Sequence, residues 1–265
     1  MKIIFLGTGS FNSLKNFQTN YIIQHNGKNL LFDCGQDIRF SLKYSNLSYK
    51  DIDAVYITHQ HADHSGGLET LAFSSYFDPH KSKIELFGET NLLVQLWTNT
   101  LSGGLSSLQD KIMSFDDYFN VTYVDSEKNT FFWEDIEFTI IKTTHIINKY
   151  YIVPSFGLLF TDPESGKTIF CTGDTQFNLK TLNDSYKKSD IIIHDCECLP
   201  FCSGVHSNFI ELSSLPTKTK NKIICVHYQD TILSESETDT ISEKWLNQSS
   251  INGLKFATRG LILNI

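Results

Sequence analysis

Residues 58–67 read THQHADHSGG and place three histidines and one aspartate within six positions. The stretch follows DAVYI, a run that is typical of a buried strand. Alternate side chains of a strand share a face, so the end of this strand can direct His59 and His61 to one side, and a turn then adds Asp63 and His64. Imidazole and carboxylate groups are a common ligand set for Zn²⁺ and a less selective one for Mn²⁺ or Fe²⁺. The pattern therefore predicts a metal site.

Three further candidate ligands lie far along the chain, each at the end of a predicted strand. His145 ends the run FTIIKTTH, Asp174 follows IFCTG, and His227 ends KIICVH. A surface histidine cluster without a metal is the alternative, and a single histidine at such a place is usually structural. The three together with the first cluster favour a metal centre that is assembled from several strands.

The surrounding elements must bring these side chains together. The runs KIIFLG, YIIQH and NLLFD predict strands, and Asn26-Gly27 between the last two predicts a two-residue hairpin turn. Residues 101–120 show no clear pattern. Two runs of strands, each followed by helices, predict an α/β fold in which two packed sheets have helices outside. Helices are expected over residues 35–46, with Ile38, Leu42 and Phe40 facing inward, and over 65–77, 89–100, 177–188, 207–214 and 240–248.

Size and composition exclude several classes of protein. The 265 residues, of which 40% are hydrophobic and 20% charged, are ordinary for a globular protein, and we expect one domain over residues 1–265. A formal charge of −8 argues against a broad basic surface for nucleic acid. No apolar stretch approaches the ~18 residues of a membrane span, and MKIIFLGTGS is typical of a first strand. Six cysteines in such a chain are expected to be reduced thiols, as in a cytoplasm.

The motifs FLGTGS, LLFDCG, THQHADHSGG, His145, TGDT and VHYQD, in this order, resemble the metallo-β-lactamase superfamily over nearly the whole chain. The resemblance implies an αββα sandwich of two mixed sheets flanked by helices, with a dinuclear metal site at one edge. It implies two Zn²⁺ per chain, with Mn²⁺ or Fe²⁺ as alternatives. By position, one metal would be held by His59, His61 and His145, the second by Asp63, His64 and His227, and Asp174 would bridge both.

Asp33, in the run FDCG, has two interpretations that the sequence leaves open. By its position in the superfamily's pattern, it resembles a carboxylate that hydrogen-bonds a histidine ligand and so fixes the orientation of the ring. Alternatively, it is the N-cap of the helix that is expected to follow it.

The segment IIIHDCECLPFCSGVHSNFIEL offers a proton donor for a leaving group. It resembles the tRNase Z branch of the superfamily, in which a His-Glu pair ends a strand and a later histidine opens a helix. His194-Asp195 matches the pair, with Asp in place of Glu, and His206 matches the later histidine. The resemblance implies that His206 protonates the leaving oxygen or stabilises phosphoryl charge while Asp195 orients it, with Asp63 as a further catalytic residue. An ordinary helix-start residue is the alternative for His206, and we expect His194 inside the sheet.

This proton donor favours phosphodiester hydrolysis over β-lactam or thioester cleavage, because a diester needs an activated nucleophile, charge neutralisation and an acid for the leaving alkoxide. The tRNA-processing enzymes carry a basic, Gly-rich arm between the positions that match His145 and Asp174. Here only 28 residues separate these two positions, and a short hairpin uses nearly all of them. We therefore expect a small phosphodiester and no stable nucleic-acid partner.

The overall layout and the run HDCEC…SGVHSNFIELSSLP…HYQD resemble the cyclic-nucleotide phosphodiesterases that phages use against cyclic-pyrimidine (Pycsar) signalling, and their bacterial homologues. The resemblance implies hydrolysis of 3′,5′-cyclic nucleotides, such as cCMP or cUMP, in the cytoplasm of a bacterium or a phage-infected cell. The alternatives are another small cyclic phosphate, tRNase Z-type RNA cleavage, lactonase or thioesterase chemistry, and a scaffold that binds nucleotides without cutting them.

The same resemblance implies a homodimer in which a loop of the neighbouring copy closes the pocket. Residues 101–120 and the run NKYYIVPSF, residues 148–156, are the two candidates for that loop. Tyr150, Tyr151 and Phe156 could stack on a base. Packing into the core is the alternative that we favour for these aromatic residues.

Cys196, Cys198 and Cys202 have the spacing C-x-C-x₃-C, which is not that of a standard zinc knuckle. One small-phosphodiester relative in the superfamily, the phosphoribosyl cyclic phosphate phosphodiesterase, has an additional cysteine-rich zinc site, so a third metal is one interpretation. Buried or partly exposed thiols are the interpretation that we favour.

Overall fold

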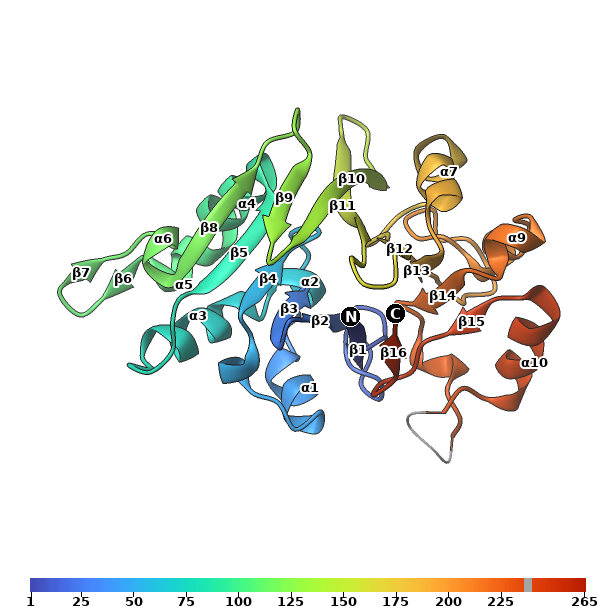
Figure 1. Ribbon diagram of the computed structural model, residues 1–265, viewed down its shortest axis with the longest axis horizontal. Coiled ribbons are helices and arrows are strands. Elements are labelled where there is room, and N and C mark those ends of the chain that lie inside the picture. Colours follow the sequence, from blue (N-terminus) through green and yellow to red (C-terminus); the bar gives the residue numbers. More distant parts are fainter. Residues whose placement is uncertain (236–239) are drawn as a thin grey trace.

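Two large sheets pack face to face, with helices on their outer sides (Figure 1). The computed structural model describes residues 1–235 and 240–265. The first sheet has the order β16 (Ile262–Asn264), β1 (Lys2–Gly7), β2 (Asn20–His25), β3 (Lys28–Phe32), β4 (Ala54–Tyr56), β5 (Ile84–Glu89) and β8 (Phe119–Val124). The second has the order β15 (Lys255–Phe256), β14 (Ile223–Val226), β13 (Ile191–Asp195), β12 (Thr168–Cys171), β11 (Ile152–Thr161), β10 (Ile136–Ile147) and β9 (Thr130–Trp133).

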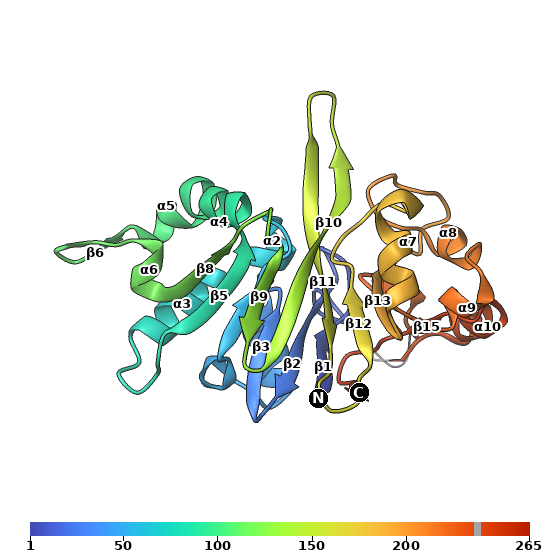
Figure 2. The ribbon, with the colours of Figure 1, turned by 45° about the horizontal axis from the view of Figure 1, so that its top comes forward.

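The helices divide between the two sheets, because they connect strands of the same sheet and cover its outer face (Figures 1 and 2). With the first sheet lie α1 (Ile38–Tyr44), a 3₁₀ turn (Tyr49–Asp51), α2 (Ala62–Ser65), α3 (Leu68–Tyr76), α4 (Thr90–Leu96), a π-helical turn (Trp97–Leu101), α5 (Ser102–Leu105) and α6 (Phe115–Tyr118). With the second lie α7 (Leu179–Lys188), α8 (Phe209–Ser213), α9 (Thr217–Lys220), a 3₁₀ turn (Asp230–Ile232) and α10 (Glu243–Asn252).

Both sheets are mixed. In the first, β3, β4, β5 and β8 pair in parallel, and the remaining pairs are antiparallel. In the second, β12 to β15 pair in parallel and β9 to β12 pair antiparallel. Parallel strands that are covered on both faces are apolar throughout, as Ile223–Val226 illustrates with its four buried residues. The αββα arrangement of two mixed sheets flanked by helices is thus as predicted.

The hairpin between β2 and β3 forms at the predicted turn. Asn26 and Gly27 have φ values of 49° and 75°, the left-handed conformation that a two-residue hairpin loop requires at both positions. Asparagine and glycine adopt this conformation at low cost, so the register of the strand pair is fixed locally.

The hydrophobic core lies between the sheets and draws on both of them, for example Phe32 and Tyr56 from the first and Phe138 and Phe160 from the second. A second cluster, which includes Leu182 of α7, fills the space between the second sheet and its helices. Both clusters combine aliphatic with large aromatic side chains, and they pack against the strands that carry the candidate site.

The long antiparallel pair β10–β11 extends beyond the sandwich as a protruding hairpin (Figure 2). Strand β10 was predicted to end at His145, but it continues to Ile147. The register shifts between Thr144 and Ile146, so the ladder is irregular at His145. Such a bulge re-aims a side chain without ending the strand, which is why the strand pattern alone placed the end too early.

Two other predictions about elements are wrong, and one segment without a clear pattern proves to be structured. The helix expected over residues 65–77 is divided into α2 and α3. Phe40 was expected to face inward but is 52% exposed, whereas Ile38 and Leu42 are buried. Residues 101–120 contain α5, α6 and a small hairpin of β6 (Ser107–Leu108) and β7 (Lys111–Ile112). Among the described residues, none of the helices combines the length and apolar character that crossing a membrane would require.

Candidate metal centre

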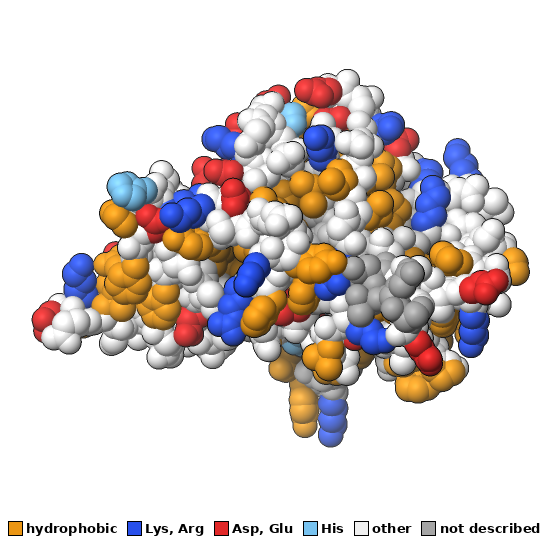
Figure 3. All heavy atoms as spheres, turned by 90° about the horizontal axis from the view of Figure 1, so that it is seen from below, with side chains coloured by type: hydrophobic (Ala, Val, Ile, Leu, Met, Phe, Trp, Pro, Cys, Tyr) orange, Lys and Arg blue, Asp and Glu red, His pale blue; other side chains and the backbone are white. Residues whose placement is uncertain are grey.

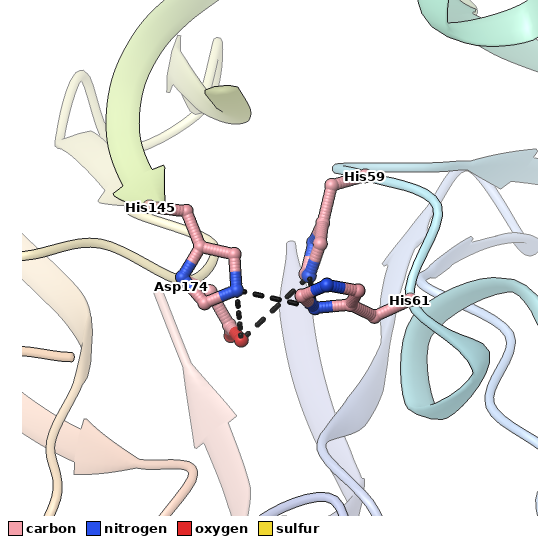
Figure 4. A group of neighbouring side chains, drawn as sticks. All are labelled: His59, His61, His145 and Asp174. Carbon is pink, nitrogen blue, oxygen red and sulfur yellow. Dashed lines mark hydrogen bonds and ion pairs between the residues drawn. The ribbon is translucent and has the colours of Figure 1, made fainter. Parts of the chain in front are cut away.

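Four side chains from three parts of the chain converge at one edge of the sandwich (Figure 4). His59 and His61 lie after β4, His145 lies in β10, and Asp174 follows β12. The distance from His61 Nδ1 is 3.0 Å to His59 Nε2 and 3.2 Å to His145 Nε2. One ligand atom from each of the four residues lies within 4.8 Å of those of the others. This group could therefore hold one metal ion.

A second group lies beside the first and shares Asp174 with it. His64 Nε2 lies 3.2 Å from Asp63 Oδ2 and 3.3 Å from Asp174 Oδ1, and His227 Nε2 lies 3.3 Å from Asp63 Oδ2. These four ligand atoms also lie within 4.8 Å of one another. Burial alone would raise the pKa of Asp63, but the adjacent His64 and His227 lower it well below its usual range. Asp63 is thus a deprotonated carboxylate that can bind a cation.

The state of the imidazoles fits a metal centre. Burial lowers the pKa of His59, His61 and His145, so at neutral pH each of these rings keeps a lone pair for a ligand. Three ring nitrogens converge here, because His61 Nδ1 lies within 3.2 Å of both His59 Nε2 and His145 Nε2. The buried His64 Nε2 faces the carboxylate oxygens of Asp63 and Asp174, at 3.2 and 3.3 Å. A cation that takes nitrogen and oxygen ligands would satisfy all of these atoms.

Asp33 lies behind the second group and accepts hydrogen bonds from His64 and Thr58. Its carboxylate accepts hydrogen bonds from His64 Nδ1 at 2.7 Å, from Thr58 N at 2.8 Å and from Thr58 Oγ1 at 2.9 Å. The alternative interpretation of Asp33 as an N-cap is wrong, because α1 begins after Asp37. The bond to His64 Nδ1 leaves Nε2 as the ring atom that faces the other candidate ligands.

His145 is oriented by a main-chain atom. Its Nδ1 donates to the carbonyl oxygen of Val205 at 2.9 Å, which leaves Nε2 for the first group. The sequence analysis missed this contact, because a carbonyl group carries no residue-type signal. The only indication was the position of Val205 beside His206, in a segment already expected to reach the site.

His206 and Asp195 form a pair at the same edge. His206 Nδ1 lies 2.8 Å from Asp195 Oδ2, and Thr175 N donates to that same oxygen at 2.8 Å. Burial opposes a charge on His206, but attraction to Asp195 outweighs it and raises the pKa of the imidazole to about 10. Helix α8 begins at Phe209, so His206 is not a helix-start residue. The ring carries a proton and lines the cavity described below.

The ligand candidate His227 and the carboxylate Asp33, which binds His64, both have a left-handed backbone, with φ of 64° and 61°. Such conformations cost on the order of 1–3 kcal/mol for a residue other than glycine, and they cluster at functional sites. His227 N donates to Thr8 O at 2.7 Å, which ties the end of β14 to the loop after β1. His227 Nδ1 lies 3.5 Å from Asp195 Oδ1, so Asp195 faces both His227 and His206.

The remaining residues singled out from the sequence lie outside the two groups. His194 is fully buried, as predicted, with Nε2 2.6 Å from Tyr186 OH. Cys196 and Cys198 are buried and Cys202 is exposed, all as free thiols. Among the described residues, the groups that could hold a metal contain no cysteine. Phe156 packs in the core, but core packing is wrong for Tyr150 and Tyr151, which are 82% and 64% exposed at the tip of the protruding hairpin.

A cavity of about 450 Å³ opens over both groups. Besides candidate site residues, its walls contain five side chains that the sequence analysis did not single out. For Phe11 the signal was available, since it directly follows the motif FLGTGS. Among the described residues, the lining contains no lysine or arginine. The five side chains that were not singled out are Phe11, Gln18, Gln36, Ile146 and Val205. Ala62 of the histidine motif also lines the cavity.

Comparison with known proteins is consistent with the motif analysis. A family model described as anti-Pycsar protein Apyc1 matches residues 1–250. An anti-Pycsar protein Apyc1 of Paenibacillus harenae is 34% identical over 235 residues, which cover 88% of this chain and 91% of the relative. An anti-Pycsar protein Apyc1 of Bacillus phage vB_BsuM-Goe3 is 33% identical over 241 residues, with coverage of 87% and 90%.

Solved structures share the fold. The human short form of tRNase Z superposes with a TM-score of 0.68 at 20% identity, over 100% of this chain and 99% of that one. A further match is described as having the metallo-β-lactamase fold. The αββα metallo-β-lactamase sandwich predicted from the sequence is therefore confirmed.

Proposed function

Because this chain belongs to the anti-Pycsar protein Apyc1 family, we propose that it is a metal-dependent phosphodiesterase that hydrolyses 3′,5′-cyclic nucleotides. One observation carries the proposal. Two histidine–aspartate groups that share Asp174 lie beside His206, which is hydrogen-bonded to Asp195, and all of them line or adjoin one small cavity. A diester needs this combination of charge neutralisation, an activated nucleophile and an acid for the leaving group.

The ligand sets follow from the two groups. His59, His61, His145 and Asp174 would hold one cation, and Asp63, His64, Asp174 and His227 would hold the other, since the two groups share Asp174. Nitrogen and oxygen donors suit Zn²⁺, with Mn²⁺ or Fe²⁺ as alternatives. Two such cations supply a nucleophile from water at neutral pH and neutralise phosphate charge. The protein itself contributes the fixed positions of seven side chains, of which all but His61 are buried.

His206 is the acid of this mechanism. Its Nδ1–H is held by Asp195 Oδ2, so Nε2–H is the proton that can reach a substrate oxygen. Thr175 N binds the same carboxylate oxygen and fixes its position. Transfer of this proton from Nε2 would neutralise the sugar alkoxide as the P–O bond breaks. General acids in this role commonly increase the reaction rate about 10²- to 10⁴-fold.

The cavity favours a small substrate with a single negative charge. Its volume of about 450 Å³ lies within the range of roughly 300–1,000 Å³ that is usual for small-molecule sites. Polyanions are usually bound by clusters of lysine and arginine. Among the described residues, none of the lining residues is of either type. The lining therefore supports a cyclic nucleotide, whose diester carries one charge, such as cCMP or cUMP.

We further propose that the enzyme is a cytoplasmic homodimer and that the hairpin tip closes the pocket of the neighbouring copy. The tip exposes Ile147, Tyr150, Tyr151 and Ile152, and it continues from the strand that carries His145 (Figure 2). Analytical ultracentrifugation should give twice the mass of one chain. A double variant Tyr150→Ser, Tyr151→Ser should weaken association, and an unchanged dimer would exclude this tip as the contact.

The function is tested with a panel of substrates. Metal-loaded protein is assayed with 3′,5′-cyclic nucleotides, bis-p-nitrophenyl phosphate and precursor tRNA, as wild type and as His206→Ala. We expect cyclic-nucleotide hydrolysis by the wild type, and a loss of about 10²-fold or more in the variant with its metal retained. Cleavage of precursor tRNA without turnover of cyclic nucleotides would overturn the proposal. Normal cyclic-nucleotide turnover by His206→Ala would exclude His206 as the acid.

A further inference from the structure

A buried carboxylate with no role in the mechanism so far lies two residues beyond Asp195. Glu197 is 1% exposed and follows the end of β13. It is followed by the segment 198–207, which we name the acid loop because it contains His206. Burying a carboxylate is costly unless hydrogen bonds compensate it, so its partners indicate what it stabilises.

Glu197 binds the acid loop in its middle and at its C-terminal end. Its Oε1 accepts from Ser203 N at 2.7 Å and from Asn208 Nδ2 at 3.3 Å. Its main chain adds two bonds, from Glu197 N to Ser207 O and from Phe209 N to Glu197 O, both at 2.9 Å. One residue therefore fixes the middle of the loop and the point where α8 begins.

Asn208 completes this arrangement. Its amide nitrogen also donates to the carbonyl oxygens of Leu199 and Phe201, each at 3.1 Å. Its amide oxygen accepts from Ile210 N at 3.0 Å and caps α8. Glu197 and Asn208 together thus satisfy main-chain groups of the acid loop that a surface loop of this length would otherwise leave to water.

Two groups of the site depend on the conformation of this loop. The carbonyl of Val205 orients His145, and His206 is the proposed acid. A short chain of contacts leads from Glu197 to them, because Ser203, which binds Glu197 through its N–H, accepts a bond from Val205 N through its hydroxyl at 3.3 Å. The loop tip itself is exposed, with Phe201 61% accessible, so little packing holds it.

We propose that Glu197 is a positioning residue for phosphodiester cleavage, which acts by fixing the acid loop so that His206 lies over the scissile bond. The inference rests on the proposed function, since it assigns Glu197 to the protonation of the leaving oxygen. Glu197 touches neither the substrate nor the candidate ligands, and it acts through Ser203 and Asn208.

The test separates protonation from every other step by the choice of leaving group. Opening a cyclic nucleotide releases a sugar alkoxide, which needs a proton. Bis-p-nitrophenyl phosphate releases p-nitrophenolate, which leaves without one. In Glu197→Ala, kcat for the cyclic nucleotide should fall about 10- to 100-fold, while kcat for bis-p-nitrophenyl phosphate should stay within about threefold. Glu197→Gln keeps an acceptor oxygen at the same place and should recover most of the loss.

Two matched variants control for folding. Asn208→Asp preserves the cap of α8 but replaces the donor of Glu197 by a like charge, so it should reproduce the selective loss even if Glu197→Ala does not fold. Glu211→Gln weakens the same helix start, where Glu211 Oε2 accepts from Asn208 N at 2.9 Å, but leaves the contacts of Glu197 intact. It should not change the ratio of the two rates.

A readout that needs no turnover comes from Cys202, which lies in the acid loop and is exposed, while the other five cysteines are buried. A nitroxide on Cys202 should become more mobile in Glu197→Ala and Asn208→Asp, and remain as in the wild type in Glu211→Gln. Equal losses with both substrates, or unchanged label mobility, would overturn the role of Glu197. If the wild type failed to cleave cyclic nucleotides while the label responded as expected, the proposed function would fail and the anchoring of the loop would stand.

Discussion

At the scale of single residues, the orientation of a histidine ligand depends on what its second ring nitrogen binds. Asp33 illustrates this, since it accepts from His64 Nδ1 and from both the N–H and the hydroxyl of Thr58. In Asp33→Ala the His64 ring loses its orienting acceptor, so we expect metal affinity to fall about 10- to 100-fold. Competition with a chromophoric chelator measures the change.

The comparison variant for Asp33 is Asp33→Asn, which keeps the size of the side chain and one acceptor oxygen. We expect its loss of metal affinity to be smaller than that of Asp33→Ala, while both variants lose the buried charge. Wild-type affinity in Asp33→Ala would contradict the idea that this carboxylate orients His64.

The six cysteines should differ sharply in reactivity. Cys202 is exposed and the other five are buried, and burial raises the pKa of the Cys171 thiol to about 12. Thiolates react and buried thiols do not. A disulfide reagent at pH 8 should therefore modify one thiol per folded chain rapidly and all six after denaturation. Cys202→Ser should abolish the rapid phase, and a second rapid thiol in the native protein would contradict the burial.

The sequence indicated the candidate site through residue types, and it missed main-chain contacts, which do not depend on the residue type. All seven ligand candidates could be predicted because histidine and aspartate at strand ends are a readable pattern, and the structure brings these seven together. The carbonyl of Val205 could not be predicted, because any residue has one. Asp33 stayed ambiguous, since a carboxylate before a helix serves equally as a cap or as a histidine partner until the distances are known.

At the scale of elements, the carboxyl ends of β13 and β14 are each followed by a carboxylate that anchors a loop at the cavity. Asp230, three residues after His227, accepts from Leu14 N at 2.7 Å, from Lys15 N at 3.0 Å and from the hydroxyl of Ser13. It thus holds the loop after β1, which carries Phe11 of the cavity wall.

Loosening that loop should affect binding more than chemistry. In Asp230→Ala we expect KM for the cyclic nucleotide to rise about 3- to 10-fold with kcat within about twofold, because Phe11 lies on the wall and not among the proposed reacting groups. Steady-state kinetics with metal-loaded protein measure both constants. A fall in kcat with unchanged KM would show that this loop positions the reacting groups instead.

The elements themselves could be predicted where the pattern is local and could not where tertiary structure decides. The turn at Asn26-Gly27 requires left-handed residues and was readable. The continuation of β10 past His145 was not, because a bulge leaves no mark in the alternation of residues. The exposed Tyr150 and Tyr151 were expected in the core on hydrophobicity alone, which does not reveal a protruding hairpin.

At the scale of the whole molecule, the formal net charge is −8. On the face in Figure 3, lysine and arginine side chains of the described residues are scattered among acidic and neutral ones. Family membership and the αββα fold, both predicted from motif order, are confirmed. The single domain over residues 1–265 stays a prediction.

Metal binding should increase the stability of the fold, because the candidate ligands come from both sheets. His59 and Asp63 follow a strand of the first sheet, and His145, Asp174 and His227 lie in or after strands of the second. Without cations the buried Asp63 and Asp174 lack their proposed charge partners. A cation that binds only the folded chain, at about 1,000 times its Kd, adds roughly 4 kcal/mol of stability.

For a chain of this size, that stabilisation corresponds to a rise in Tm of about 8–16 °C. Calorimetry of protein that has been freed of metal with a chelator, before and after addition of Zn²⁺, measures the shift in Tm. His227→Ala removes one ligand of the second group and should reduce the shift, whereas Cys202→Ser, at an exposed position outside both groups, should leave it as in the wild type. Equal Tm values with and without the metal would show that these side chains do not bind it in the folded state.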